Sequence, residues 1–203
     1  MSDTVNLSVA LQKVHITSGC QMEDRVVPSS ERSQNAMAHL CCQMLAPELL
    51  PQRAIEDRGR PVRSLPALFM VNGFLCVTDK AAQVLRDHDL GKGGLYNLEL
   101  FRSDGQTPIT GPFWALNFGE KKSALNLAES KGLEHSPQDR FSPSLLIQPD
   151  DVAVTAAALQ GADLWGDEKL VSGFFVSPKL AKALFKAKLD KAFYLVSCRV
   201  VPE

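Results

Sequence analysis

The fold of this chain is decided by a stretch that occurs twice: residues 73–85 read GFLCVTDKAAQVL, and residues 173–184 read GFFVSPKLAKAL. Each copy is a short apolar run, a hydroxyl residue and a helix-forming segment. Thr78 and Ser177 stand where a side-chain oxygen can accept a hydrogen bond from the free N–H groups of a helix's first turn. An acid follows in one copy and a proline in the other, and both are favoured at a helix start.

A second apolar run follows each helix, at residues 95–101 and 192–201. The repeated unit opens at Gly73 and at Gly173 and is predicted to be strand, helix, strand, with both copies in equivalent places of one domain. Two copies are too few for a solenoid. Chance recurrence of a common pattern is the alternative. The sequence predicts an α+β fold with a mostly antiparallel sheet, a few packed helices and two similar strand-helix-strand units.

The first part of the chain has a different pattern. Apolar residues alternate from Val5 to Leu11 and predict a strand, and a Ser-Ser-Glu start at residues 29–31 predicts a helix. Residues 47–66 are rich in proline and charge, which predicts a linker. We therefore expect an N-terminal appendage over residues 1–60 and the α+β domain over residues 61–203.

Turn and helix signals continue between the two copies. Asp104-Gly105 lies between strand-like runs at residues 98–101 and 113–118 and predicts a turn joining them. Residues 124–131 read as a short helix, and residues 150–159 fit either a helix or a strand. Residues 91–94 read GKGG, but no Ser or Thr follows the lysine, so a flexible connector is predicted rather than a phosphate loop.

Composition bounds the compartment and the partners. The chain has 203 residues, 45% of them hydrophobic, and a formal net charge of -1, so neither nucleic acid nor an anionic membrane is expected as a partner. The N-terminus has no signal-peptide pattern, and no apolar run is long enough to cross a bilayer. Five scattered cysteines agree with a reducing compartment. We expect a cytoplasmic protein.

Residues that could carry chemistry are few. Histidines stand at positions 15, 39, 88 and 135, and His39 with Cys42 is the nearest to a metal-ligand pair, although zinc needs three or four ligands. No nucleophile elbow, zinc-protease motif or dinucleotide fingerprint is present. We expect no metal, no cofactor and no enzymatic activity, with a Cys/His nucleophilic site left open. Trp114 and Trp165 are predicted to be core residues, with partner anchoring as the alternative.

Several of these segments together resemble a known family. Residues 163–165, 173–177 and 198–201 resemble the C-terminal signature of immunity family eleven of bacterial polymorphic toxin systems, and residues 114–117 and 125–130 resemble its central segment. The resemblance consists of spaced apolar and turn residues rather than a catalytic motif.

The resemblance covers residues 65–201 and implies a protein that binds and neutralises a toxin encoded beside it. Such toxins are delivered by type VI or contact-dependent secretion. Since no signal peptide is recognised, the toxin is expected to act in the cytoplasm, which favours a nuclease. The expected partner is thus the cognate toxin; the oligomeric state stays open. The alternatives are a small-ligand or regulatory binding module and an enzyme with a Cys/His site.

An inhibitor of a nuclease gains from carboxylates placed where the nucleic acid backbone would lie. Residues 149–168 contain five acids and no lysine or arginine, although a solvated surface is the plainer explanation of such a block. These acids are the predicted toxin-binding residues: Asp150, Asp151, Asp163, Asp167 and Glu168.

Overall fold

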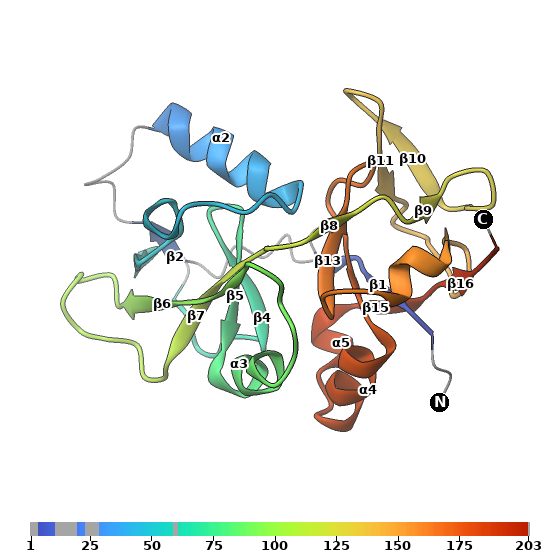
Figure 1. Ribbon diagram of the computed structural model, residues 1–203. Coiled ribbons are helices and arrows are strands. Elements are labelled where there is room, and N and C mark those ends of the chain that lie inside the picture. Colours follow the sequence, from blue (N-terminus) through green and yellow to red (C-terminus); the bar gives the residue numbers. More distant parts are fainter. Residues whose placement is uncertain (1–3, 11–19, 23–28, 59–60, 203) are drawn as a thin grey trace.

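The computed structural model describes residues 4–10, 20–22, 29–58 and 61–202. It has an α+β fold in which two lobes stand side by side (Figure 1). Most strand pairs are antiparallel, as predicted.

The first lobe is a six-stranded sheet in which only β3 and β6 pair in parallel. Helix α3 (Asp79–Arg86) packs on the face that carries Leu75 and Val77. The opposite face, with Phe74 and Cys76, shares a second cluster with helix α2 (Ser29–Leu40). The 3-10 helix η1 (Pro47–Leu49) follows α2 in the chain. The strand order is β2 (Cys20–Met22), β3 (Arg53–Glu56), β6 (Gly94–Phe101), β7 (Phe113–Asn117), β5 (Phe74–Thr78) and β4 (Leu68–Val71).

The second lobe contains a five-stranded sheet, a three-stranded sheet and a hairpin. Helices α4 (Pro178–Lys186) and α5 (Asp190–Phe193) and the 3-10 helix η2 (Ala156–Leu159) belong to this lobe. The larger sheet has the order β15 (Leu195–Ser197), β1 (Asn6–Ser8), β14 (Phe174–Val176), β13 (Leu164–Asp167) and β8 (Lys121–Lys122). The smaller sheet is β16 (Arg199–Val200), β12 (Ala153–Val154) and β9 (Leu125–Asn126), and the hairpin is β10 (Leu133–Ser136) with β11 (Arg140–Pro143).

Strand register confirms the predicted repeat. In the first lobe β7 lies between β5 and β6, and Ala115 is opposite both Cys76 and Tyr96. In the second lobe β1 lies in the same way between β14 and β15, with Leu7 at the centre. The two copies therefore occupy equivalent places, as predicted. The strand that lies between the two strands of each copy differs in origin: β7 follows the first copy in the chain, whereas β1 comes from the N-terminal segment.

The repeat extends further than the sequence pattern. Ala54 pairs with Leu100 where β3 runs parallel to β6, and Val154 pairs with Val200 where β12 runs parallel to β16. An antiparallel strand flanks β3 and β12 in turn, β2 in the first lobe and β9 in the second. Both lobes are thus versions of one strand arrangement.

The N-terminal segment is not an appendage, and this prediction was wrong. Strand β1 is central to the second lobe, while β3, which lies within the predicted linker, is internal to the first. Local sequence cannot reveal this, because the two strands that flank β1 are about 170 and about 190 residues away in the chain. Leu11, the last residue of the predicted alternation, lies outside the described residues.

Both predicted caps stand at helix starts. Ser177 uses its side chain, because its Oγ accepts a hydrogen bond from the N–H of Leu180 at 3.1 Å. Thr78 precedes α3 in the same way but makes no side-chain cap bond.

Gly73 is required at its turn, since its φ is +90° and an added Cβ would lie 2.9 Å from the Cβ of Ala36. Gly173 is buried where a Cβ would meet Leu170.

Local predictions between the copies met mixed outcomes. Strands β6 and β7 are present, and the turn between them holds, with Gly105 donating to the carbonyl of Arg102 at 2.8 Å. Residues 91–93 lie in the connection between α3 and β6, as predicted, and Gly94 begins β6. The helix predicted over residues 124–131 is wrong, because β9 forms there instead. Residues 150–159 contain both a strand, β12, and a helical turn, η2.

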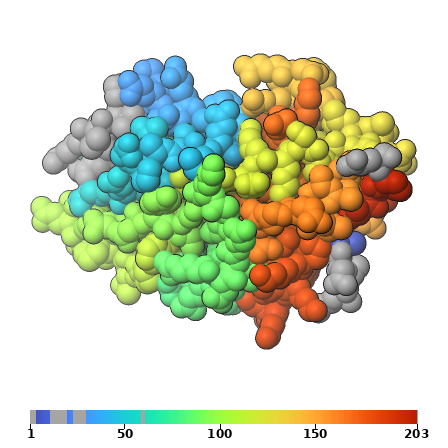
Figure 2. Space-filling model, viewed as in Figure 1, coloured from blue at the N-terminus to red at the C-terminus, as the bar shows by residue number. Residues whose placement is uncertain are grey.

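The lobes share a core. One buried cluster combines Leu75 and Val77 of β5 with Phe174 and Val176 of β14, and α3 contacts α4 across the junction. Figure 2 shows the lobes in close contact along this junction. A third buried cluster surrounds Trp165, which is fully buried, so its predicted core role is confirmed. No helix among the described residues is long and apolar enough to cross a membrane.

Candidate functional site: a groove between two inserted elements

Two elements interrupt the repeat at equivalent points. Helix α2 lies between β2 and β3 of the first lobe, and the β10–β11 hairpin lies between β9 and β12 of the second. Both stand on the same side of the molecule, at the top of Figure 1, and Figure 2 shows a notch between them. This notch is part of a groove of about 630 Å³ lined from both lobes. The groove is thus formed where the two copies of the repeat carry different inserted elements.

The two walls of the groove are tied together. The guanidinium Nη1 of Arg140, on β11, lies 2.6 Å from the Sγ of Cys41, which follows α2. Near this contact the N–H of Ser172 donates to the carbonyl of Leu40 at 2.9 Å. These contacts join α2 to the second lobe, so the groove exists before any partner binds. A preformed groove loses less conformational entropy on binding than one that must be ordered.

The groove lining combines apolar and amide side chains. Met37 is 57% exposed and stands on the α2 wall. Methionine and arginine are both enriched at protein interfaces, and methionine adapts its shape to a partner. Glutamine amides both donate and accept hydrogen bonds, as the backbone of an extended segment requires. The apolar lining residues include Ala38, Leu40, Pro137 and Val171, and the amides are Gln34, Gln43 and Gln138.

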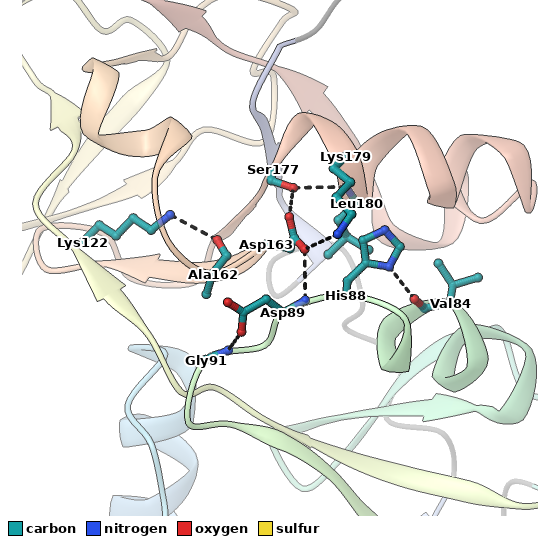
Figure 3. A network of polar contacts seen from close by, with 10 residues as sticks. All are labelled: Val84, His88, Asp89, Gly91, Lys122, Ala162, Asp163, Ser177, Lys179 and Leu180. Atoms are coloured by element: carbon teal, nitrogen blue, oxygen red, sulfur yellow. Dashed lines mark hydrogen bonds and ion pairs between the residues drawn. The ribbon is translucent and has the colours of Figure 1, made fainter.

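Asp163, a predicted toxin-binding residue, lies at the junction of the lobes instead of on an open surface (Figure 3). Its carboxylate accepts hydrogen bonds from the Ser177 hydroxyl at 2.6 Å and the Asp89 N–H at 3.0 Å. Lys179 completes the network at 3.6 Å. Burial acts to raise the pKa of Asp163, but these partners together hold that pKa below its usual value. The network joins the cap of α4 to the loop after α3.

Asp167 is also internal, with 1% of its surface exposed. Its Oδ2 accepts hydrogen bonds from the N–H groups of Ala124 and Leu125 at 2.8 and 2.9 Å, and its Oδ1 accepts from the N–H of Lys169 at 2.9 Å. These bonds hold the start of β9 in an extended conformation, which is why no helix forms there. The carboxylate of Asp167 is occupied by the fold.

The other three predicted acids lie at the surface or partly exposed. Asp150 and Asp151 share one turn before β12, where Asp150 accepts from the hydroxyl of Ser197 at 2.8 Å. Glu168 lies just after β13 and accepts from the hydroxyl of Ser123 at 2.6 Å. The structure therefore divides the predicted acidic stretch into two internal carboxylates and three that a partner can reach.

His39 and Cys42 do not form a nucleophile and base. The Nε2 of His39 accepts the N–H of Leu75 at 3.0 Å, the ring packs between Phe74 and Phe118, and burial lowers its pKa to about 3. Burial also raises the pKa of the Cys42 thiol, which points at the carbonyl of Gly173. Both side chains are buried within the core, where the Nδ1 of His39 has no hydrogen-bond partner among the described residues.

Trp114 is half-buried beneath the guanidinium of Arg86, which lies 3.9 Å from the ring centroid. His15 lies outside the described residues. Among the residues that the structure describes, no three His, Cys, Asp or Glu side chains gather in a metal-binding cluster.

No protein-family model matches the chain, and no curated protein matches it significantly.

The residues of the groove were not predicted from the sequence. Met37 interrupts the polar face of a helix otherwise rich in serine, glutamine and charge, which was the one available signal. No local sequence signal marks Arg140 or Gln138, because they line a groove only where the chain brings them opposite a helix about 100 residues earlier.

Proposed function

We propose that this chain is an immunity protein that binds and neutralises a cognate bacterial toxin acting in the cytoplasm, a nuclease delivered by type VI or contact-dependent secretion. The single observation that carries the proposal is the groove between α2 and the β10–β11 hairpin. It is preformed, combines apolar with hydrogen-bonding side chains and is open to a protein segment. An extended segment of the toxin would fill it.

The segments that resemble immunity family eleven support the proposal through their positions. Trp165 stacks on Phe175 with ring centroids 4.4 Å apart, and both belong to the buried core of the second lobe. Such residues form a scaffold, while the inserted elements above it present the surface that a partner would meet. An inhibitor that must match one toxin needs this division between scaffold and recognition surface.

The test is to mix the purified chain with the purified product of the neighbouring gene. We expect a stable complex by size-exclusion chromatography with light scattering, and loss of nuclease activity at equal concentrations. Met37→Asp should restore toxin activity by placing a charge in the groove. Met44→Asp is the matched control, since Met44 is 55% exposed but does not line the groove. Full nuclease activity in the presence of excess wild-type chain would contradict the proposal.

A small-ligand or regulatory binding module is the second candidate, because a volume of about 630 Å³ also suits a small molecule. The same variants separate the two. Under this candidate a small ligand would raise the melting temperature of the wild type and the Met44→Asp variant but not of Met37→Asp, and the neighbouring gene product would not bind.

A further inference from the structure

Two adjacent leucines stand out on the surface of the second lobe. Leu145 is 62% exposed and Leu146 is 81% exposed, the largest exposed fractions among the large hydrophobic residues of the described chain. They lie in the segment between β11 and β12, which we call the leucine loop (residues 144–151). Single exposed apolar residues are common, but an adjacent pair at this exposure in a well-packed domain marks a contact surface.

The leucine loop is held in one conformation by its own hydrogen bonds. The N–H of Ile147 donates to the carbonyl of Ser144 at 3.2 Å, and the N–H of Asp151 donates to the carbonyl of Gln148 at 3.2 Å. The Asp151 carboxylate accepts from the N–H of Gln148 at 2.8 Å. Ile147 is 7% exposed and anchors the loop in the core.

These bonds also fix the backbone beside the leucines. The carbonyl of Leu146 accepts from the Gln148 amide at 2.8 Å, and its N–H donates to the Ser144 hydroxyl at 3.3 Å. The exposure of both leucines thus follows from a built turn. The backbone is already ordered, so a partner that buries them meets little ordering cost.

The charge beside the leucines selects the kind of partner. Asp150 and Asp151 belong to the next turn of the loop, and Asp150 is positioned by Ser197 and by Arg199, whose Nε donates to its carbonyl at 2.9 Å. An apolar pair flanked by carboxylates complements an apolar pocket flanked by lysine or arginine. An anionic membrane surface is disfavoured, because the same carboxylates would be repelled from it.

We propose that Leu145 and Leu146 are the apolar anchor of the toxin complex and insert into a pocket of the toxin that is rimmed by basic side chains. This inference rests on the proposed function. The groove lies at the turn end of the β10–β11 hairpin and the leucine loop follows its open end. Four residue pairs separate them, about 10 Å, which one interface of standard size spans.

The experiment measures the dissociation constant between the chain and the purified product of the neighbouring gene by calorimetry. Leu145→Ala with Leu146→Ala should raise it about 100-fold, about tenfold per leucine. Leu159→Ala is the matched control, because Leu159 is 47% exposed on η2, outside the loop. Circular dichroism and the melting temperature should not change, since neither leucine contributes to the core; a single Leu146→Ala variant gives the same test with less change to the loop.

The outcomes are distinguishable. If wild type binds and the double variant binds equally well, the anchor is refuted while the proposed function stands. If wild type forms no complex, both are refuted. Sedimentation of the wild-type chain alone as a dimer that the double variant abolishes would assign the leucines to a second copy. Binding to phosphatidylcholine vesicles that the double variant abolishes would assign them to a membrane, and either result overturns the proposal.

Discussion

Asp89 and Asp163 hold each other across the junction of the two lobes. The N–H of Asp163 donates to the carbonyl of Asp89 at 2.7 Å, and the N–H of Asp89 donates to the Asp163 carboxylate at 3.0 Å. Asp163 takes the place of Ala67 in the repeat, since each accepts through its carbonyl from the following cap residue, Ser177 or Thr78. The second copy of the repeat thus carries a carboxylate where the first has a methyl group.

Asp163→Asn should therefore loosen the junction. The amide keeps one acceptor oxygen, but its NH2 faces either the Ser177 hydroxyl or the Asp89 N–H, so one of the two charge-assisted hydrogen bonds that the carboxylate accepts is lost, at a cost of about 1 to 3 kcal/mol. Urea unfolding at neutral pH measures the change. Asp87→Asn, at an exposed position after α3, is the control and should leave the unfolding free energy unchanged. Equal stability of both variants would contradict the role of the network.

The same carboxylate should give the protein an acid-sensitive step. Burial opposes ionisation of Asp163, but the hydrogen bonds from Ser177 and Asp89 outweigh it and lower the pKa in the folded state. A lowered folded-state pKa contributes stability that is complete above the unfolded pKa of about 3.9 and is lost as pH falls through the folded value. Wild type should lose stability below about pH 4, and Asp163→Asn should lose less over that range. Parallel curves for both would exclude this carboxyl as the source.

Two adjacent glycines predict opposite effects of one methyl group. A Cβ on Gly93 would lie 2.2 Å from the carbonyl oxygen of Asn117, whereas on Gly94 it would meet nothing closer than 3.8 Å, the ring of Tyr96. Gly93→Ala should destabilise by more than 1 kcal/mol or so, as backbone clashes do. Gly94→Ala should be neutral or stabilise slightly, because it restricts the unfolded chain. Thermal unfolding of the pair tests the close crossing of the two segments, and equal melting temperatures would argue against it.

Trp165→Ala should be among the most destabilising single changes in the second lobe. The ring is fully buried against Phe175, and Lys122 lies over it at 4.6 Å from the centroid. Removing a large buried aromatic costs about 3 to 5 kcal/mol, measured by denaturant unfolding. Trp114→Ala should cost less, since that ring is only half-buried. A stable Trp165→Ala protein that no longer bound the toxin would reverse the assignment to the core.

The repeat was predictable because its signals are local. A hydroxyl cap, a helix former and apolar residues three apart describe α3 and α4 wherever they lie in the fold. The role of β1 was not predictable, since a three-residue strand acquires its meaning only from β14 and β15. The predicted helix over residues 124–131 is wrong for a related reason. The Asp167 carboxylate, more than 40 residues away, accepts hydrogen bonds from two backbone N–H groups of that segment.

The candidate site was less predictable than the fold. Charge alone selected the acidic stretch, and charge does not reveal that Asp163 and Asp167 accept hydrogen bonds inside the molecule. The groove depends on Arg140 reaching Cys41 across the lobes, which no spacing in the sequence indicates. A recognition surface such as this groove is built from segments far apart in the sequence, whereas a catalytic motif is often one continuous stretch.

The exposed acids should govern how fast the toxin is captured. Asp150, Asp151 and Glu168 remain accessible, and exposed charges accelerate association more than they hold a complex. Replacing all three by their amides should slow association about tenfold at low salt and flatten its salt dependence, with little change in dissociation. The amides keep the hydrogen bonds that Ser197, Gln148 and Ser123 donate to these side chains.

Stopped-flow mixing at several salt concentrations measures the association rate, and a folded variant is verified by circular dichroism. Asp87→Asn with Glu99→Gln removes two exposed charges from the first lobe and serves as the control, which should associate nearly as fast as wild type. The steering role requires the two variants to differ at low salt and to converge at high salt, where the charges are screened. An unchanged rate at low salt for the triple variant would refute electrostatic capture by these acids, and it would leave the groove and the leucine loop as the surfaces that determine binding.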